Sequence, residues 1–340
     1  MIPAAPIPMQ QPDSPRWQAA WRQAVRDPRE LLEILGLGAL AQGISEAAAT
    51  QFPLRVPRGF IARMRHGDPA DPLLRQVLPV LEEERIVPGF ALDAVGDAAA
   101  RRGNGVIHKY NGRALLIATG SCAVNCRYCF RRHYPYAEDT AAAGGWREAT
   151  ALIREDASIH EVILSGGDPL SLADHKLADL TDALRDIPHL RRLRIHSRLP
   201  IVLPERIDAG LLGWLRSLPW PVAVVVHANH ANEFDASVDA ALAALRSTGA
   251  SLLNQAVLLR GVNDSTAALA ALCERGFSAG VLPYYLHQLD RVTGTAHFEV
   301  DDARALALHE SLAARLPGYL VPRLVREIAG NPGKTPLRPL

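Results

Sequence analysis

Short apolar runs alternate with amphipathic stretches from about residue 105 onward. Apolar runs of this length, bounded by polar residues, are typical of buried strands, and they predict strands at residues 114–118, 161–164, 193–196, 222–226, 252–258 and 281–285. Helical spacing of apolar residues predicts helices between them, at residues 176–185, 209–218, 238–247 and 266–275. Strand followed by helix, repeated along the chain, indicates an α/β fold of parallel βα units. Six units are too few for a closed eight-stranded barrel, so a partial barrel and an open doubly wound sheet both stay open.

The first hundred residues follow a different pattern. Their apolar spacing is helical, with helices expected at residues 17–36 and 71–84, and Pro53, Pro57 and Pro69 break it. The extreme N-terminus is rich in Pro and Gln and predicts a loose tail. We therefore expect four parts: the tail (1–16), a helical region (17–104), an α/β core (105–316) and a C-terminal segment (317–340).

Composition excludes several classes of protein. The 340 residues are 48% hydrophobic, and 37 basic residues balance 36 acidic ones to a net charge of +1. This balance gives no general attraction to nucleic acid or to a membrane surface. No apolar run approaches the roughly 18 residues that span a bilayer, and the proline-broken N-terminus lacks a signal-peptide core. We expect a globular, cytoplasmic protein with reduced thiols.

Three of the four cysteines lie within eight residues, with the spacing C-x3-C-x2-C: Cys122, Cys126 and Cys129. Iron–sulfur clusters are usually held by four thiolates, so a cluster held by three has one iron free to bind a substrate or cofactor. A structural zinc site that adds His133 is the alternative. A disulfide is disfavoured because the clustered thiols are odd in number and nothing indicates secretion. The fourth cysteine, Cys273, lies in an apolar helical pattern and predicts a packed thiol.

Polar motifs follow the predicted strands at one end. They are the cysteine cluster, Ser165-Gly-Gly-Asp-Pro169, His227-Ala-Asn-His-Ala-Asn-Glu233, Asn254-Gln255, Arg260-Gly-Val-Asn-Asp264 and Asp290. Turn chemistry explains any one of them alone. Six at the carboxyl ends of successive strands predict a functional site there. The pair Gly166-Gly167 predicts exposed backbone N–H groups that bind a carboxylate or phosphate.

Several of these strings together resemble the lysine 2,3-aminomutase family of radical S-adenosylmethionine enzymes. The resemblance runs from about residue 50 to 338 and rests on Cys122-Ala-Val-Asn-Cys-Arg-Tyr-Cys-Phe-Arg-Arg132, Leu164-Ser-Gly-Gly-Asp-Pro-Leu170, Ser197-Arg-Leu-Pro-Ile-Val-Leu-Pro-Glu-Arg206, Asn254-Gln-Ala-Val-Leu-Leu-Arg-Gly-Val-Asn-Asp264 and Gly330-Asn-Pro-Gly-Lys-Thr-Pro336. The resemblance implies a partial (β/α)6 radical-SAM barrel with a helical extension at its N-terminus. It also implies a 4Fe–4S cluster, S-adenosylmethionine and pyridoxal phosphate.

The resemblance also assigns residues to these cofactors. The three clustered cysteines match the ligands of the cluster, and the positions that match the S-adenosylmethionine site are Gly166, Gly167, Asp168, His230 and Gln255. Lys334 resembles the catalytic lysine that forms a Schiff base with pyridoxal phosphate. The phosphate of that cofactor needs cationic and hydrogen-bonding partners, and the matching stretch is Lys109, Tyr110 and Arg113.

Three further matches predict L-lysine as the substrate. Arg131 matches the arginine that binds the α-carboxylate, for which its planar fork is suited. Asp290 matches a carboxylate that receives the side-chain ammonium of lysine, and Glu327 occupies the place of a second aspartate. Two anionic groups at the distal end favour a cationic substrate and disfavour glutamate. The added methylene of Glu327 departs from the family pattern.

Two departures indicate a subgroup. The chain stops shortly after Lys334, and Ser265 stands where the long catabolic members have a zinc-binding cysteine, so no zinc is expected. The short form resembles aminomutases that make (R)-β-lysine from (S)-α-lysine for bacterial elongation factor P. That resemblance implies a lysyl-tRNA-synthetase-like ligase as a functional partner and a flavodoxin- or ferredoxin-type reductant. A radical enzyme acting on another amino acid and a non-enzymatic metal-binding module are the alternatives. Lys334 together with Arg131 favours the aminomutase, because pyridoxal chemistry needs the lysine.

Overall fold

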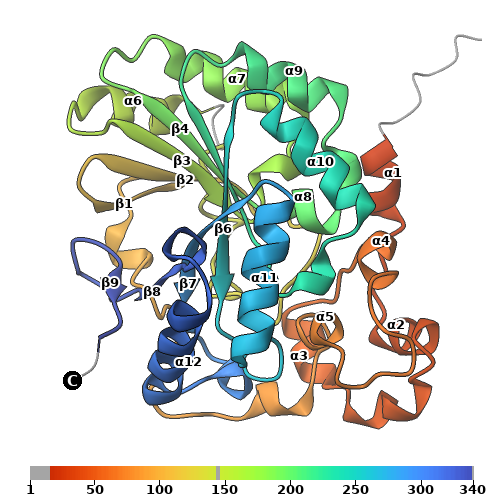
Figure 1. Cartoon of the computed structure of the whole chain (residues 1–340). Coiled ribbons are helices and arrows are strands. Elements are labelled where there is room, and N and C mark those ends of the chain that lie inside the picture. Colours follow the sequence, from red (N-terminus) through yellow and green to blue (C-terminus); the bar gives the residue numbers. More distant parts are fainter. Residues whose placement is uncertain (1–15, 143–145, 339–340) are drawn as a thin grey trace, which may run out of the picture.

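A single nine-stranded sheet organises the chain, and its strand order β1 to β9 follows the order of the sequence. The computed structural model describes residues 16–142 and 146–338. The expected N-terminal tail lies almost wholly outside these residues. The strands are β1 (Val106–Tyr110), β2 (Arg113–Thr119), β3 (Glu161–Gly166), β4 (Arg192–Ser197), β5 (Val222–Val226), β6 (Ser251–Val257), β7 (Leu282–His287), β8 (Arg323–Arg326) and β9 (Thr335–Pro336). Figure 1 shows them as a fan in the middle of the molecule.

Strands β2 to β8 are parallel, and an antiparallel strand flanks them at each edge, β1 beside β2 and β9 beside β8. All six strands predicted from the sequence are present, with ends that differ by at most two residues. The doubly wound alternative is wrong, because the strand order of such a sheet reverses and this one does not. The partial (β/α)6 barrel stays a prediction.

Sequence reasoning missed β1, β8 and β9. The hairpin of β1 and β2 turns at Asn111-Gly112, where Gly112 has a φ of +79° and Tyr110 pairs with Arg113. Asn-Gly between two extended runs is a strong hairpin signal, so β1 was detectable. The four-residue β8 and the two-residue β9 are too short to give a periodic pattern.

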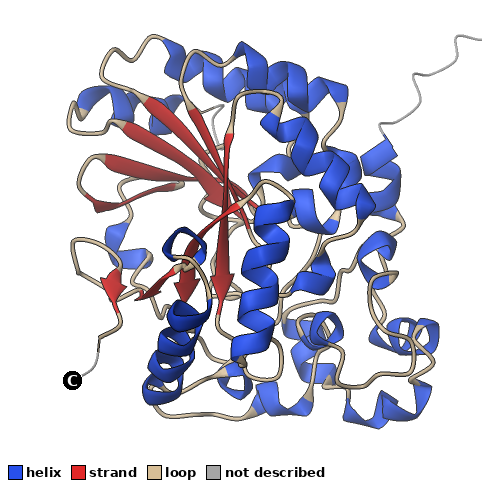
Figure 2. Ribbon diagram, viewed as in Figure 1, coloured by secondary structure: helices blue, strands red, loops and turns tan. Residues whose placement is uncertain are grey.

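The helices that follow the strands lie along the outside of the fan (Figures 1 and 2). They are α6 (Arg147–Glu155), α7 (Asp174–Arg185), α8 (Leu199–Val202), α9 (Ala209–Ser217), α10 (Ala236–Arg246), α11 (Thr266–Ser278) and α12 (Asp302–Arg315). The four helices predicted in this part of the chain are confirmed as α7, α9, α10 and α11. Side-chain N-caps begin several of them, which satisfies otherwise unpaired N–H groups. The hydroxyl of Ser265 caps α11 by accepting the Ala268 N–H at 3.2 Å.

The N-terminal region is helical but more broken than expected. Its helices are α1 (Arg16–Arg22), α2 (Pro28–Ile34), α3 (Glu46–Gln51), α4 (Arg58–Ile61) and α5 (Pro72–Arg75), which lie together to one side of the fan (Figure 1). The continuous helices expected at 17–36 and 71–84 were wrong. Within 71–84, α5 ends at Arg75, four residues before Pro79, and Pro28 and Pro72 each occupy the first turn of a helix, capped by Asp27 and Asp71. Proline suits that position because its missing N–H would have no helical partner there.

Each parallel strand presents two different faces. Its outward side chains are apolar and join the main hydrophobic core under the helices, as Val162 and Leu164 of β3 do. The inward side chains of β2, β3, β4, β6 and β7 line a cavity and are largely polar, as Arg194 and His196 of β4 show. Because side chains alternate along a strand, the two sets are separated by single residues. The sheet therefore joins a dry outer layer to a polar inner surface.

A buried charge cluster ties the N-terminal region to the cysteine-bearing loop. Glu83 lies in the short 3-10 helix η2 (Leu81–Glu84) and accepts two hydrogen bonds from Arg127, at 2.9 and 2.6 Å. It also accepts one from Arg132 at 2.7 Å. At most 1% of each of these three side chains is exposed. A buried carboxylate shared by two arginines is stable only while all partners are present.

Glu83→Gln is expected to lower the free energy of unfolding by about 3 kcal/mol or more, since it leaves two buried guanidinium groups without a carboxylate. Urea denaturation of the purified protein measures this loss. The matched control is Glu46→Gln, whose partner Arg29 and own side chain are 58% and 72% exposed, so a loss of at most about 1 kcal/mol is expected. Equal losses in the two variants would contradict the role of Glu83.

Candidate active site

A cavity of about 280 Å³ lies on the inner face of the sheet and reaches the carboxyl ends of its strands. Its walls include nearly all of the site residues predicted from the sequence: Lys109, Tyr110, Arg113, Cys122, Cys126, Cys129, Arg131, Gly166, Gly167, Asp168, Gln255, Asp290, Glu327 and Lys334. The exception is His230, which is not among the lining residues. The structure thus gathers residues that are more than 220 positions apart in the sequence around one space.

The three clustered thiols share this space. Burial raises the pKa of Cys129 to about 11, and the neighbouring Cys126 contributes to the rise. Burial likewise raises the pKa of Cys122, which also faces Asp168 and the other two thiols. Mutual influence of this kind requires thiols that lie near one another. Their donor set fits a group that binds three thiolates at once, such as an iron–sulfur cluster.

The zinc alternative adds His133 to the three cysteines as a fourth ligand. In the described ranges no three His, Cys, Asp or Glu side chains are placed to hold a single metal ion. The ring of His133, its expected fourth ligand, instead contacts the carbonyl oxygen of Thr293 at 3.1 Å through Nε2. His133 also does not line the cavity.

The two glycines act differently from the expectation. The N–H of Gly167 is not free for a ligand, because it donates to the carbonyl oxygen of Thr119 at 2.6 Å. A Cβ on Gly167 would lie 2.5 Å from the carbonyl oxygen of Ser121, and one on Gly166 would lie 2.6 Å from that of Thr119. Gly166 also has a φ of +114°, which favours glycine. The pair therefore lets β3 approach the loop that carries the cysteines, and the predicted exposed donor at Gly167 was wrong.

Asp168 braces the end of the neighbouring strand. Its carboxylate accepts hydrogen bonds from the Ser197 hydroxyl at 2.8 Å and from the backbone N–H groups of Leu170, Arg198 and Leu199. Burial nevertheless raises its pKa to about 6, against the effect of these donors. The side chain lines the cavity, and both of its oxygens are already engaged.

His227, rather than His230, is the histidine of its motif that faces the cavity. His230 caps a short 3-10 helix, where its Nδ1 accepts the N–H of Asn232 at 3.1 Å. Burial lowers the pKa of His227 to about 4, so its ring is neutral at neutral pH. Sequence alternation was a usable signal, since residues 223, 225 and 227 share the inward face that follows from period two.

Among the uncharged residues that line the cavity, four buried polar atoms have no hydrogen-bond partner in the described part of the chain. They are Nε2 of His196, His227 and His287, and Oε1 of Gln255. Burial also lowers the pKa values of His196 and His287 well below the usual range. Buried polar groups are nearly always satisfied, so these atoms fit a bound polar ligand that supplies their partners.

A chain of alternating charges crosses the cavity wall. Arg131 contacts Asp97 at 2.7 Å, and Asp97 contacts Lys109 at 2.6 Å. Lys109 then lies 3.6 Å from Glu327, whose other oxygen is 3.0 Å from Lys334. Because each buried charge has an opposite neighbour, its cost of desolvation is offset. Sequence reasoning missed Asp97, which lies in an irregular segment and belongs to no motif.

Asp290 differs from the other carboxylates of the cavity. No hydrogen bond or ion pair to its side chain is present among the described residues, although it lines the cavity with Glu327 and Lys334. Burial raises the pKa of Asp290 to about 7, and the charge of Lys334 opposes the rise. A carboxylate that faces a cavity without a partner is suited to a cationic group of a ligand.

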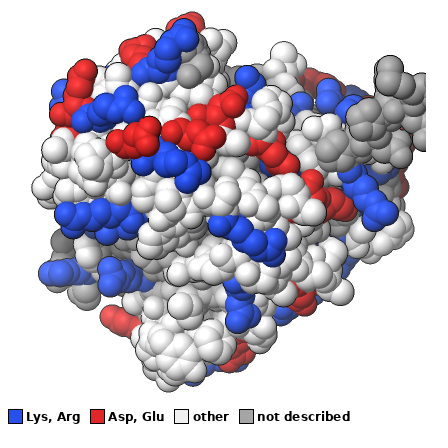
Figure 3. Space-filling view, turned by 90° about the horizontal axis from the view of Figure 1, so that it is seen from above, with Lys and Arg blue, Asp and Glu red and all other residues white. Residues whose placement is uncertain are grey.

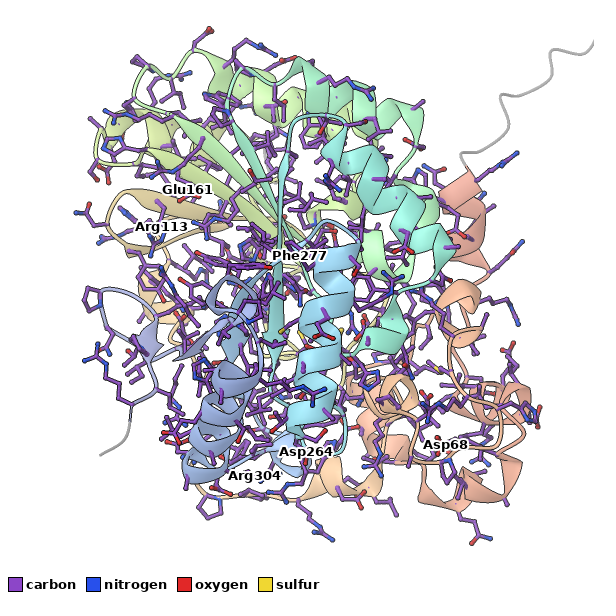
Figure 4. The ribbon with its side chains drawn as sticks, viewed as in Figure 1. Asp68, Arg113, Glu161, Asp264, Phe277 and Arg304 are labelled. Carbon is purple, nitrogen blue, oxygen red and sulfur yellow. The ribbon has the colours of Figure 1, made fainter. Side chains whose placement is uncertain are left out.

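The predicted phosphate-binding stretch is only partly free. The ammonium of Lys109 already contacts Asp97 and donates to the carbonyl oxygen of Val95 at 2.7 Å, and the hydroxyl of Tyr110 donates to Glu327. Arg113 stacks over the Tyr110 ring at 4.6 Å and has no ion pair within the described ranges. It lies at the start of β2, opposite Glu161 in the register (Figure 4). Of these three residues, Arg113 is therefore the best suited to bind a phosphate.

The free energy of unfolding should depend on pH through Asp290. Its pKa is about 7 in the folded chain and about 3.9 in an unfolded one, so between these values only the folded state keeps the proton. Wild-type stability contributed by this group therefore falls as the pH rises from about 4 to about 7. Asp290→Asn cannot titrate, and its stability relative to wild type should rise across that window in urea denaturation.

Asp302→Asn is the control for this dependence. The pKa of Asp302 is lowered, chiefly by its hydrogen bond from Arg326, so it is ionised in both states above about pH 5. Its difference from wild type should stay level between about pH 5 and 7. A level difference for Asp290→Asn as well would contradict the protonation of Asp290.

Comparison with known proteins finds relatives that match nearly the whole chain. The L-lysine 2,3-aminomutase of Escherichia coli (strain K12) is 48% identical to the chain over 327 residues, which cover 96% of this chain and 95% of that protein. The same enzyme of Haemophilus influenzae is 44% identical over 94% of each chain. That of Clostridium subterminale is 31% identical over 95% of this chain and 77% of its own length.

Two other comparisons add little. No protein-family model matches the chain. A radical SAM methyltransferase from Sphaerobacter thermophilus aligns with a TM-score of 0.43 and 17% identity over 65% of this chain and 68% of that one, which is too slight a likeness to carry an argument. The sequence relatives are close over almost the whole length, and they show that the chain belongs to the lysine 2,3-aminomutase family of isomerases.

Proposed function

We propose that the protein is a radical S-adenosylmethionine enzyme, dependent on pyridoxal phosphate, that converts (S)-α-lysine to (R)-β-lysine. The observation that carries the choice of substrate is the unpartnered carboxylate of Asp290, in the same cavity as Arg131, Lys334 and the three clustered cysteines. The names of the relatives support the same substrate. The proposal includes a partial (β/α)6 barrel and the four-part division of the chain described above.

The residues of the cavity fit three cofactors. Cys122, Cys126 and Cys129 would hold a 4Fe–4S cluster, and the unpartnered polar atoms of Gln255 and His227 suit S-adenosylmethionine. Lys334 would bind pyridoxal phosphate covalently, with Arg113 on its phosphate. When bound, these groups supply the one-electron chemistry that removes hydrogen from the β-carbon and carry the nitrogen that migrates from the α-carbon.

Arg131 is prepared for the α-carboxylate of an amino acid. Its Nε donates to Asp97 and its Nη1 to the Ser165 hydroxyl at 3.2 Å. No hydrogen bond of Nη2 is present among the described residues, and Arg131 lines the cavity. Asp97 thus fixes the plane of the guanidinium, while its outer edge stays available for a bidentate contact.

The distal ammonium of lysine would bind at Asp290 and Glu327. These carboxylates differ, because Glu327 is already bonded to Tyr110 and Lys334 whereas Asp290 is open. A carboxylate has about four lone-pair sites, so Glu327 can accept the ammonium of the substrate beside its present donors. Two carboxylates in a shielded cavity would reject the anionic side chain of glutamate.

We further propose that the product serves elongation factor P in the cytoplasm. A lysyl-tRNA-synthetase-like ligase would attach (R)-β-lysine to the factor, and a flavodoxin or ferredoxin would supply electrons to the cluster. The support is the resemblance to the short members of the family. Within the described ranges no helix has the length and apolarity to cross a membrane, and basic and acidic side chains are interspersed on the face in Figure 3.

Anaerobic reconstitution with iron and sulfide, followed by incubation with lysine, S-adenosylmethionine, pyridoxal phosphate and a reductant, should yield (R)-β-lysine. Asp290→Asn should lower kcat/KM for lysine by about tenfold or more, because a charge-assisted contact is worth about 1.5–3 kcal/mol. Its cluster absorption should be unchanged. Chromatography of the derivatised products measures both the product and the loss.

Asp68→Asn is the matched control, since Asp68 lies in the N-terminal region far from the lining residues (Figure 4). It should leave turnover unchanged. Turnover of glutamate as fast as lysine, or full activity of Asp290→Asn, would refute lysine as the substrate. Stoichiometric zinc, with no iron–sulfur absorption after reconstitution, would refute the radical mechanism.

A further inference from the structure

A buried arginine outside the predicted site reaches the cysteine loop from β4. Arg198 follows β4 directly, and its backbone N–H donates to the Asp168 carboxylate at 2.7 Å. From there its Nη1 donates to the sulfur of Cys126 and to the hydroxyl of Tyr128. Only 7% of the arginine side chain is exposed, so this cation is desolvated at the point where it meets the sulfur.

The guanidinium is held from its other side by the N-terminal region and the loop after β5. Its Nη2 donates to Gln76 at 2.7 Å and to Glu233 at 3.0 Å. It also lies over the rings of Phe60 and Tyr128, each 5.6 Å from the ring centre. Hydrogen bonds of both terminal nitrogens and the two aromatic rings fix its orientation, whereas its Nε has no partner among the described residues.

The carboxylate that neutralises Arg198 is itself fixed. Oε1 of Glu233 accepts the N–H of Asn229 at 2.8 Å, the N–H of His230 at 3.1 Å and the amide of Gln76 at 3.2 Å. Glu233 is fully buried. This explains the polar residues of the motif 227–233 that do not reach the cavity: His230 and Glu233 shape a loop that supports Arg198.

We propose that Arg198 is a positioning residue that raises the reduction potential of the iron–sulfur cluster through Cys126; this rests on the cluster of the proposed function. Reduction adds one negative charge to a cluster. A fixed cation and an N–H donor at a ligating sulfur stabilise that charge, and the effect is strong because the surroundings are dry. The same contact would set the direction in which the Cys126 sulfur faces.

The test is a redox titration of the reconstituted cluster without S-adenosylmethionine, followed by electron paramagnetic resonance. Arg198→Gln should lower the midpoint potential by about 59 mV or more, which is a tenfold change in the ratio of reduced to oxidised cluster for one electron. Arg198→Lys keeps the positive charge but loses the planar guanidinium, so its midpoint potential should fall by less. Arg198→Lys also serves if Arg198→Gln does not fold.

Arg206→Gln is the matched control. Arg206 is another fully buried arginine of the same motif, bonded to the Leu170 carbonyl at 2.6 Å and to Asp174 at 2.7 Å. It has no contact with a cysteine among the described residues. Its cluster should titrate at the wild-type potential. Equal potentials in wild type and both Arg198 variants, or an equal fall in Arg206→Gln, would overturn the proposal.

A measurement on the unaltered chain removes dependence on variant folding. Protein made with arginine labelled by ¹⁵N in its guanidinium group should show a weak nitrogen coupling to the reduced cluster in pulsed electron paramagnetic resonance. Arg198→Lys should weaken this coupling, with any remainder coming from Arg55 and Arg131, which also lie near the cysteines. A wild-type cluster that shows no arginine coupling, or a coupling that is unchanged in Arg198→Lys, would overturn the role of Arg198. Failure of the wild type to bind any cluster would instead refute the proposed function.

Discussion

The buried run of alternating charges from Arg131 to Lys334 is the constraint on which the cavity depends. It joins the cysteine loop, the strand β1 and the C-terminal segment, which are far apart in sequence, through Asp97, Lys109 and Glu327. Removing one member would leave its neighbours charged and unpaired in a dry environment, which costs far more than an exposed pair does. The run therefore places the guanidinium of Arg131 and the amine of Lys334 at set positions in one space.

Two other buried carboxylates hold the cysteine loop in place through ion pairs with arginines. Glu83 pairs with Arg127 and Arg132 on one side, and Glu233 pairs with Arg198 on the other. Both contacts depend on the N-terminal region, which supplies Glu83 and the Gln76 amide. That region is thus part of the site rather than an appendage, because it fixes the loop from which the three thiols project.

The sequence predicts the repeating part of this molecule well. Six strands and four helices follow from periodicity, because each has one face against the same apolar core. The last two strands do not, since β8 depends on pairing with β7, and β9 on pairing with β8, rather than on an apolar pattern of their own. The long helix expected at residues 17–36 does not form, because a second helix begins at Pro28, after the N-cap Asp27. The spacing of apolar residues does not show where one helix ends and the next begins.

The site, too, is only partly predictable from the sequence. Motif resemblance found the cysteines, Lys334, Arg131 and Asp290, which the structure places around one cavity. It could not find Asp97, whose partners lie 12 and 34 residues away in sequence and meet it only in the fold. It also selected His230 in a motif where strand alternation favours His227. For Gly167, an expected ligand donor proved to be a packing contact, because the identity of a backbone partner is set by tertiary structure.

The most direct test of this account is to find which lysine bonds to pyridoxal phosphate. The cavity offers two, and the charge run separates them: Lys109 is held by Asp97 and the Val95 carbonyl, whereas Lys334 contacts Glu327 at the end of the run. Borohydride reduction of the protein with bound cofactor, followed by peptide mapping, should place the pyridoxyl group on Lys334. A label on Lys109, or a Lys334→Ala protein that is labelled as fully as wild type, would contradict the account.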